Sequence, residues 1–429
     1  MTIGGDVMNN NLVIDAVRQF GTPLYLYDSN LICNNYNILK KSLPDNFEIF
    51  FSMKANPLLG ICELFKKLGS NIEVASGGEL YTALTAGFNP EQIIFTSPGK
   101  TVEELDYAIE TGIYSINAES LEEILLINDI GKSKSKTVDI SVRINPDFDI
   151  SGASIKMTGV ATQFGVDQKH AENMFNKVAD LTNVNIIGIH VYTGTQVLKA
   201  DNIVSNMEEI IKLAINMSSI GGFELKFLDL GGGFGIPYFN NETHLDMDIL
   251  RKGIAGVWQK YREKLQGTRV AVESGRYLLA EAGSYLTKVI YCKENKGKRY
   301  IICDGGSNQH ANSAFLGRYI RNNFPMRILG KDTEKVETEV VGPLCTPTDV
   351  IGQRVMLPEA SPGDILIVEK SGAYGLTDSP ILFLSHSMPA EVMLYNGNIS
   401  VLRERGEKED LLNRQKGLPN PPGKYEGTL

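Results

Sequence analysis

The chain contains few of the residues that build metal sites and disulfide frameworks. There are five cysteines and five histidines among 429 residues, and no two cysteines have CxxC spacing. Scattered cysteines are typical of proteins in a reducing compartment. We therefore expect a cytoplasmic protein with no metal site, whose free thiols are Cys33, Cys62, Cys292, Cys303 and Cys345.

Positive charge and long apolar runs are also scarce. Lysine and arginine total 42 against 51 aspartates and glutamates, which gives a net charge of −9. Nucleic-acid binding needs a basic surface, so we do not expect it as the main task. No run approaches the roughly 18 apolar residues of a membrane span, and the N-terminus lacks the basic and apolar segments of a signal peptide. The 42% hydrophobic content suits a globular enzyme.

Short apolar runs alternate with amphipathic segments through the first two thirds of the chain. Near-continuous apolar strands that alternate with helices are typical of parallel β/α packing. Eight units in about 230 residues favour a closed (β/α)₈ TIM barrel over an open doubly wound sheet. The eight runs are residues 47–51, 71–76, 92–96, 114–117, 138–145, 184–190, 225–230 and 269–273.

After Glu281 the β-rich runs follow one another without long helices. This pattern predicts antiparallel strands in a second, all-β domain, similar to a β-sandwich or β-barrel. The runs are residues 285–291, 300–304, 337–341 and 365–369, and residues 23–27 are expected to add a strand. The predicted division is an N-terminal segment at 1–35 that contributes to the β-domain, a barrel at 36–280, a C-terminal β-domain at 281–410 and a loose tail at 411–429.

A lysine stands just beyond the first apolar run. Residues 47–51 lead directly into Ser52-Met-Lys-Ala-Asn-Pro57, and barrel enzymes build their sites from such strand ends. A desolvated Lys54 would have a lowered pKa and form a Schiff base with an aldehyde. A surface lysine that opens a loop is the ordinary alternative.

Two further strand ends carry groups that suit the same chemistry. Gly231-Gly-Gly-Phe-Gly235 follows the seventh run, and its N–H groups can surround a phosphate, with Arg276 and Thr195 as further donors; a tight turn is the alternative. Glu273 ends the eighth run and needs a cationic partner, either a protonated pyridine nitrogen or a structural salt bridge. Aldehyde, pyridine and phosphate together describe pyridoxal 5'-phosphate.

Seven motifs occur in order between about residues 20 and 395. They are Ser52-Met-Lys-Ala-Asn56, Val74-Ala-Ser-Gly-Gly-Glu79, Gly188-Ile-His-Val-Tyr-Thr-Gly-Thr-Gln196, Gly231-Gly-Gly-Phe-Gly235, Glu273-Ser-Gly-Arg276, Gly342-Pro-Leu-Cys345 and Ser371-Gly-Ala-Tyr-Gly375. In these motifs the chain resembles the barrel-type PLP-dependent decarboxylases with the alanine racemase-like fold. That family contains the ornithine, diaminopimelate and arginine decarboxylases.

The resemblance implies a role for each motif. Lys54 would carry the cofactor as a Schiff base, Glu273 would face its pyridine nitrogen, and Cys345 would return a proton to the α-carbon after a quinonoid intermediate. Racemases place an arginine opposite that nitrogen, so Glu273 favours decarboxylation. Cys345 and Tyr374 would complete the active site of the partner in a homodimer with shared sites. The implied cofactor-binding residues are Lys54, His190, Tyr192, Thr195, Gly232, Gly233, Glu273, Gly275, Arg276 and Tyr374.

Three departures from the family pattern concern the substrate. Tyr192 replaces the histidine that usually stacks on the cofactor, Thr346 replaces an acidic residue, and Asn312 replaces the arginine of diaminopimelate decarboxylases. A distal zwitterion would lack its charged partners in such a pocket. The usual substrates are therefore disfavoured.

Variants within residues 190–196, 342–347 and 371–380 are most similar to a natural-product branch. It is typified by the butirosin-pathway enzyme that decarboxylates glutamate attached to an acyl carrier protein. We therefore expect α-decarboxylation of a modified or carrier-tethered amino acid such as a glutamyl carrier. The cluster of Arg318, Arg321 and Arg327 would dock an acidic carrier or bind a substrate carboxylate, unless it is an ordinary solvated face.

Alternative functions stay open. A diaminopimelate-type or siderophore-pathway decarboxylase would act on another small amino acid substrate. A PLP-binding regulator without catalytic activity is the alternative of a different class.

Overall fold

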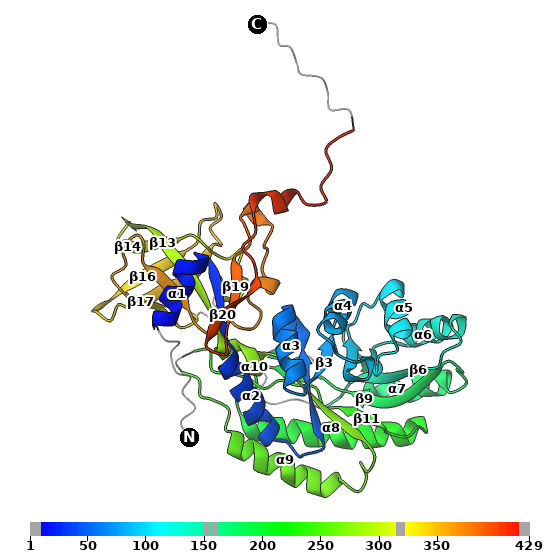
Figure 1. Cartoon of the computed structure of the whole chain (residues 1–429). Coiled ribbons are helices and arrows are strands. Elements are labelled where there is room, and N and C mark those ends of the chain that lie inside the picture. The colour runs from blue at the N-terminus through cyan, green and yellow to red at the C-terminus, as the bar shows by residue number, and fades with distance from the viewer. Residues whose placement is uncertain (1–9, 149–154, 157–161, 240, 315–321, 420–429) are drawn as a thin grey trace.

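A computed structural model describes residues 10–148, 155–156, 162–239, 241–314 and 322–419. Its first sheet is a closed barrel of eight parallel strands in the order β5-β4-β3-β2-β12-β11-β9-β6, with β5 paired to β6 (Figure 1). The strands are β2 (Phe47–Ser52), β3 (Asn71–Val74), β4 (Ile93–Thr96), β5 (Ser115–Ala118), β6 (Val138–Asn145), β9 (Val184–His190), β11 (Phe227–Asp229) and β12 (Arg269–Ser274). The predicted TIM barrel is confirmed, with one strand at each of the eight apolar runs.

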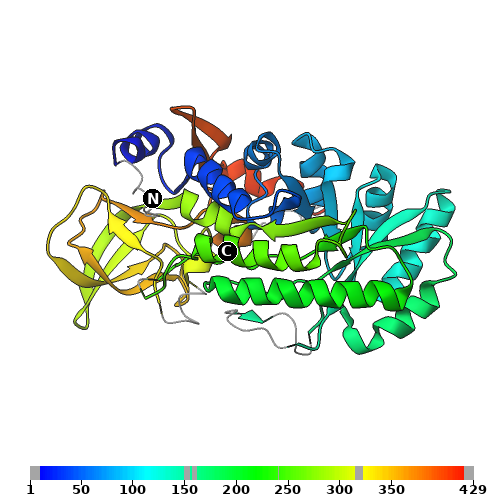
Figure 2. The same cartoon turned by 90° about the horizontal axis from the view of Figure 1, so that it is seen from below.

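Helices follow the barrel strands and cover their outer faces. They are α2 (Ser29–Lys41), α3 (Leu59–Lys67), α4 (Gly77–Thr85), α5 (Val102–Thr111), α6 (Leu121–Ser133), α7 (Gln168–Val178), α8 (Ala200–Gly221), α9 (Met247–Tyr261) and the short α10 (Arg276–Leu279). The long helices α8 and α9 run side by side (Figure 2). Local sequence fixes several ends: Thr101 and Glu104 form a capping box at α5, and Gly112 ends that helix in the left-handed region.

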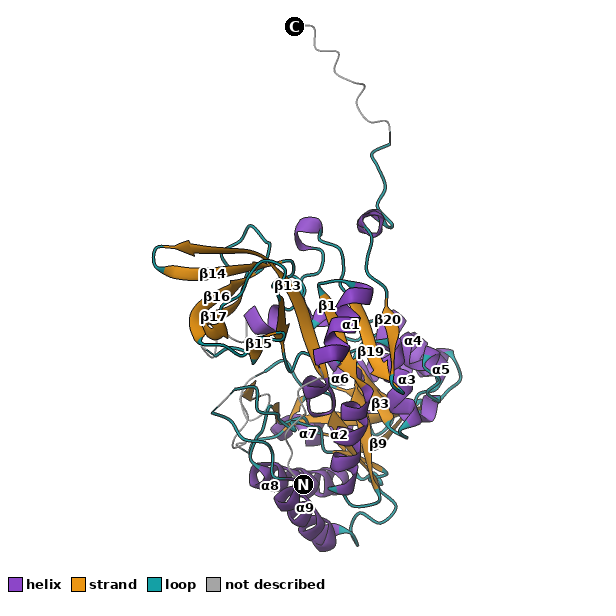
Figure 3. Ribbon diagram, turned by 60° about the vertical axis from the view of Figure 1, so that its left-hand side comes forward, coloured by secondary structure: helices purple, strands orange, loops and turns teal. Residues whose placement is uncertain are grey.

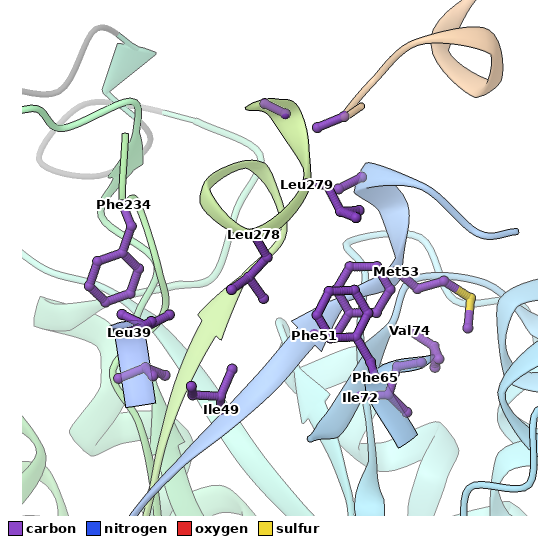
Figure 4. Close-up of a cluster of buried hydrophobic side chains, with 14 of the residues drawn as sticks. Leu39, Ile49, Phe51, Met53, Phe65, Ile72, Val74, Phe234, Leu278 and Leu279 are labelled. Atoms are coloured by element: carbon purple, nitrogen blue, oxygen red, sulfur yellow. The ribbon is translucent and has the colours of Figure 1, made fainter. Parts of the chain in front are cut away.

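The barrel interior is apolar at one end and polar at the other. A cluster of buried side chains that contains Phe50, Ile94 and Phe227 fills the apolar end of the interior. On the outside, Phe51 of β2 stacks on Phe65 of α3 with ring centroids 4.0 Å apart (Figure 4). This packing holds β2, whose end carries Lys54 in the 3₁₀ turn η1 (Met53–Ala55).

The second sheet has the order β17-β16-β14-β13-β1-β19-β20, and β18 pairs with β13 and β15. In Figure 3 its strands lie beside the barrel. The bounds are β1 (Leu24–Asp28), β13 (Gly283–Asn295), β14 (Lys298–Cys303), β15 (Met326–Ile328), β16 (Lys335–Val341), β17 (Val350–Pro358), β18 (Ile365–Val368), β19 (Ala390–Tyr395) and β20 (Asn398–Arg403). The expectation of antiparallel pairing is wrong at two places, since β1–β19 and β14–β16 are parallel. Long connections separate both pairs in sequence, and these permit a parallel crossover where a hairpin would not.

Helix α1 (Asn10–Phe20) packs on this sheet through Val13 and Ala16, against Leu24 and Leu26 of β1. Three short strands, β7 (Ile155–Lys156), β8 (Val166–Asp167) and β10 (Gly194–Thr195), lie near the barrel mouth. The remaining 3₁₀ turns are η2 (Pro90–Gln92), η3 (Ala280–Ala282), η4 (Leu376–Asp378), η5 (Phe383–Ser385) and η6 (Lys408–Leu412).

Among the described residues no helix has the length and apolar character needed to cross a membrane. The predicted domain bounds remain a prediction. The loose tail predicted at 411–429 overlaps η6 at its start, and residues 420–429 lie outside the described part.

Candidate active site

Polar and charged side chains gather where the barrel strands end. Arg143, His190 and Asp229 are in register across the neighbouring strands β6, β9 and β11. Residues in parallel register direct their side chains to the same face, so these three enter the barrel together. Glu73 and Glu273 join them from β3 and β12, and all five are at least 95% buried.

Lys54 is paired with a carboxylate. Its Nζ donates to both carboxylate oxygens of Glu73, at 2.8 and 3.0 Å, and its side chain keeps 36% exposure toward the cavity. Burial lowers the pKa of Lys54, but the negative charges of Glu73 and Glu273 outweigh it and raise that pKa well above its ordinary value. The sequence-based expectation of a lowered pKa is therefore wrong for the chain as it stands.

Glu273 lies deep in the barrel without a full ion pair. Its Oε1 has no hydrogen-bond partner among the described residues, and His190 Nε2 lies 3.5 Å from it. Burial, with the charge of Arg143 nearby, lowers the pKa of His190 well below its ordinary value, so the imidazole is neutral. Burial and the charges of Glu73 and Asp229 raise the pKa of Glu273 well above its ordinary range.

The glycine run lies between two backbone segments. Gly231 and Gly233 have φ of +64° and +99°, a region that favours glycine. A Cβ on Gly232 would lie 2.3 Å from the carbonyl oxygen of Glu273, and one on Gly233 would lie 2.7 Å from that of Gly194. Only glycines permit this close approach of the backbone at the cavity wall.

Arg276 and Tyr374 lie on the same side of the cavity. Arg276 donates to the hydroxyl of Tyr238 at 3.0 Å, and its guanidinium lies 4.6 Å from the ring centre of Tyr374. Tyr374 in turn donates its backbone N–H to the carbonyl of Ala55 at 2.8 Å. This contact holds Tyr374 at the cavity of its own chain, and the role implied for it in the site of a partner subunit stays a prediction.

Most predicted site residues line one continuous space. A narrow crevice and an adjoining cavity of about 490 Å³ share several lining residues. Together they are lined by Lys54, His190, Tyr192, Thr195, Gly233, Glu273, Gly275, Arg276, Asn312 and Tyr374. Gly232 is not among the described lining residues, but its backbone approaches the carbonyl of Glu273 closely. Cys345 is exposed and, like Thr346, is absent from the described lining, while Arg318 and Arg321 lie outside the described residues.

Sequence reasoning missed several residues that line or support this space. Arg143, Phe164 and Asp378 line the cavity, and Glu73 and Asp229 adjoin Lys54 and Glu273. The sequence alone could have identified Glu73, Arg143 and Asp229 as site candidates. Each is a charged residue inside or at the end of an apolar strand, where a charge needs a partner.

Arg327, the remaining member of the predicted basic cluster, donates to Glu369 at 3.0 Å and to Asn10 at 2.9 Å. It is thus engaged within the second sheet and its helix α1.

Comparison with known proteins agrees with this geometry. Residues 30–280 match the family model of the pyridoxal-dependent decarboxylases, pyridoxal binding domain. The chain is 41% identical over 404 residues to the L-glutamyl-[BtrI acyl-carrier protein] decarboxylase of Niallia circulans, covering 93% of this chain and 94% of that protein. It is 32% identical to the diaminopimelate decarboxylase of Aquifex aeolicus, covering 91% of each.

Solved structures of diaminopimelate decarboxylases also resemble this chain over nearly its whole length. The crystal structure of diaminopimelate decarboxylase from Helicobacter pylori complexed with L-lysine superposes with a TM-score of 0.84 at 30% identity, covering 94% of this chain and 98% of that one. The enzyme from M. jannaschii in co-complex with L-lysine gives a TM-score of 0.88 at 28% identity, covering 95% of each chain. The chain therefore belongs to the pyridoxal-dependent decarboxylases and is a carboxy-lyase whose cofactor is pyridoxal 5'-phosphate.

Proposed function

We propose that the substrate is an amino acid tethered to an acyl carrier protein, such as a glutamyl thioester, which loses its α-carboxyl group as CO₂. The observation that carries this proposal is the absence of an unpaired cation for a second substrate carboxylate. Among the described lining residues of the 490 Å³ cavity the cations are Lys54, Arg143 and Arg276. Lys54 is paired with Glu73, and Arg143 donates to Glu119 at 2.8 Å. Arg276 lies on the glycine side, where the cofactor phosphate needs it.

The residues present fit the three reactive parts of the cofactor. Lys54 supplies an amine for its aldehyde, and Glu273 supplies a carboxyl with an unpartnered oxygen for its ring nitrogen. Arg276, whose buried Nε has no partner among the described residues, suits the phosphate together with Thr195 and the glycine run. When bound, the cofactor supplies an electron sink for the electron pair that departing CO₂ leaves behind.

Glu73 governs the charge of Lys54. The amine must lose a proton before it acts as a nucleophile, and a carboxylate 2.8 Å away is the nearest acceptor. Tyr192 adds a flat face beside the amine, with its ring centre 5.6 Å from Nζ. The pair of Lys54 and Glu73 therefore holds one proton at a place where it can be transferred.

The far end of the cavity presents neutral groups to the substrate. Asn312 is 5% exposed, and its Nδ2 has no partner among the described residues. A buried amide N–H that lacks an acceptor favours a ligand with a carbonyl oxygen there. A thioester offers such an oxygen, whereas a free carboxylate would also need a cation.

A second copy of the chain completes the site in this proposal. Cys345 follows β16 in the sequence, and it is exposed rather than turned into the cavity of its own chain. We infer a homodimer in which Cys345 of each chain donates the proton to the α-carbon in the other, with Thr346 beside it. The five cysteines are free, which supports function in the reducing cytoplasm.

Mass spectrometry of a glutamyl-loaded carrier protein tests the proposal. Incubation with the holoenzyme should lower the carrier's mass by one CO₂, and Lys54→Ala should abolish that change. Free glutamate and free diaminopimelate serve as comparison substrates. An unchanged carrier mass, together with CO₂ release from either free amino acid, would contradict the tethered substrate and leave the decarboxylase chemistry intact.

A further inference from the structure

We infer that Asp229 and Glu273 share a single proton, and that Asp229 is the positioning residue that keeps Glu273 oriented toward the cofactor. The inference goes beyond the proposed function, because it concerns how two carboxyl groups of this chain coexist and does not depend on the substrate.

The two carboxyl groups lie close together in full burial. Asp229 and Glu273 are 0% and 1% exposed, and one oxygen of each lies with a ring nitrogen of His190 in a cluster whose atoms are all within 4.8 Å of one another. The backbone fixes this proximity, since Asp229 pairs with Ala271 two residues before Glu273, and Glu273 N–H donates to the carbonyl of Gly231 at 2.8 Å.

Each carboxyl has an oxygen without a partner. Asp229 Oδ1 accepts the backbone N–H of Gly231 at 2.9 Å, whereas Asp229 Oδ2 and Glu273 Oε1 have no hydrogen-bond partner among the described residues. Two ionised carboxylates cannot bond to each other. A carboxylic acid and a carboxylate can do so, and one proton would satisfy both oxygens.

The charged and titratable groups around the pair do not neutralise both carboxyls. These five groups are Lys54 on η1, Glu73 on β3, Arg143 on β6, His190 on β9 and Tyr192 just after β9. No lysine or arginine in the described part of the chain lies within ion-pair distance of Asp229 or Glu273. Lys54 and Arg143 are engaged by Glu73 and Glu119, and His190 is neutral.

The expected titration supports the same arrangement. Burial and the charge of Glu73 raise the pKa of Asp229 to about 7, against the lowering effect of the Gly231 N–H. The folded chain therefore binds a proton that the unfolded chain has already released above about pH 4. The contribution of this proton to the free energy of unfolding is at its maximum below about pH 4. It is lost as the pH rises toward about 7.

The functional consequence follows from the charge of the pair. With one shared proton the pair carries a single negative charge, which is what a protonated ring nitrogen needs opposite it. A cation opposite Glu273, such as a protonated ring nitrogen, would draw the proton of the pair onto Asp229. Asp229, whose Oδ1 is anchored by the Gly231 N–H, would then donate to Glu273 and keep it ionised and oriented.

The amide variant Asp229→Asn tests the inference because it imitates the protonated acid. Its carbonyl can still accept from Gly231, and its amide can still donate to Glu273, but it cannot lose that hydrogen. In the full-length chain prepared without cofactor, the Tm of Asp229→Asn relative to wild type should rise by about 2–4 °C between about pH 5 and pH 8. Asp332→Asn, at an exposed aspartate, should show no such change with pH.

A second readout does not depend on stability. Infrared spectra of the wild-type holoenzyme near neutral pH should contain the carbonyl band of a buried protonated carboxyl, and the Asp229→Asn holoenzyme should lack it. A Tm difference that is constant with pH, or a wild-type spectrum without this band, overturns the inference. Neither result would affect the mass change predicted for the carrier, so the two proposals fail separately.

Discussion

At the scale of single residues, the chemistry depends on pairs that lie far apart in sequence. Lys54 was identifiable from its strand end, but its partner Glu73 lies 19 residues away on the next strand. Sequence reasoning therefore captured burial, which lowers a lysine pKa, and missed the nearby negative charge, which reverses the result. The partner of an ionisable group can be known only when strand register is known.

Glu73→Gln should move the pKa of Lys54 downward, because it removes the largest charge effect that raises this pKa and leaves only the smaller effects of Glu273 and the nearby tyrosines against burial. The pH at which cofactor incorporation into the cofactor-free chain is half-maximal should fall, as followed by absorbance. Decarboxylation should slow by about 10²-fold through loss of the proton acceptor. Glu63→Gln, at an exposed position on α3, is the matched control. A midpoint that stays in place or rises would refute the role given to Glu73.

At the scale of elements, the barrel strands were predictable and the second sheet only partly so. Strands β2 and β4 are almost entirely buried and mostly apolar, and such apolar runs are read directly from sequence. In the second sheet the runs were found, but β1 lies between β13 and β19, which come more than 250 residues later. Local patterns carry no information about pairing over such separations.

Phe65→Ala should destabilise the barrel beneath Lys54 by about 3–5 kcal/mol, because it removes a fully buried ring that stacks on Phe51. Leu59→Ala alters the same helix at a side chain that is 40% exposed, so it should change stability by no more than about 0.5 kcal/mol. Urea denaturation of both variants measures the difference. Equal losses would mean that the Phe51–Phe65 contact does not support β2.

Gly233→Ala should weaken cofactor binding at least about fivefold, since a strained backbone position costs about 1–3 kcal/mol. Its φ is +99°, and the new Cβ would lie 2.7 Å from the carbonyl of Gly194. Gly256→Ala on α9 meets no atom within 4 Å, so it should leave cofactor binding unchanged and add up to about 1 kcal/mol of stability. Equilibrium titration of the cofactor-free chains compares the two, and equal affinities would remove the glycine run from the cofactor site.

At the scale of the whole molecule, the site draws on both sheets. The barrel supplies Lys54 and Glu273, and the segments around the second sheet supply Asn312 and Tyr374 to the same cavity. The family motifs identified these residues from sequence. The motifs did not show which of these residues lie in the cavity of their own chain: of Tyr374 and Cys345, only Tyr374 is among its described lining residues.

Mixing two inactive variants tests the shared site. Lys54→Ala and Cys345→Ala should each be nearly inactive as pure proteins. After the subunits are exchanged in equal amounts, about half of the dimers should be mixed, each with one intact site of two, so that about a quarter of wild-type activity returns. No recovery, when subunit exchange has been verified by mass, would contradict the proposal that Cys345 acts across the dimer.

The most direct test of the central claim is to identify the lysine that holds the cofactor. Borohydride reduction of the holoenzyme makes the bond between lysine and cofactor permanent, and peptide mass spectrometry then locates it. We expect a single modified lysine, Lys54, in the peptide that contains Ser52-Met-Lys-Ala-Asn56. Modification of another lysine, such as the buried Lys100, with Lys54 unmodified would contradict it.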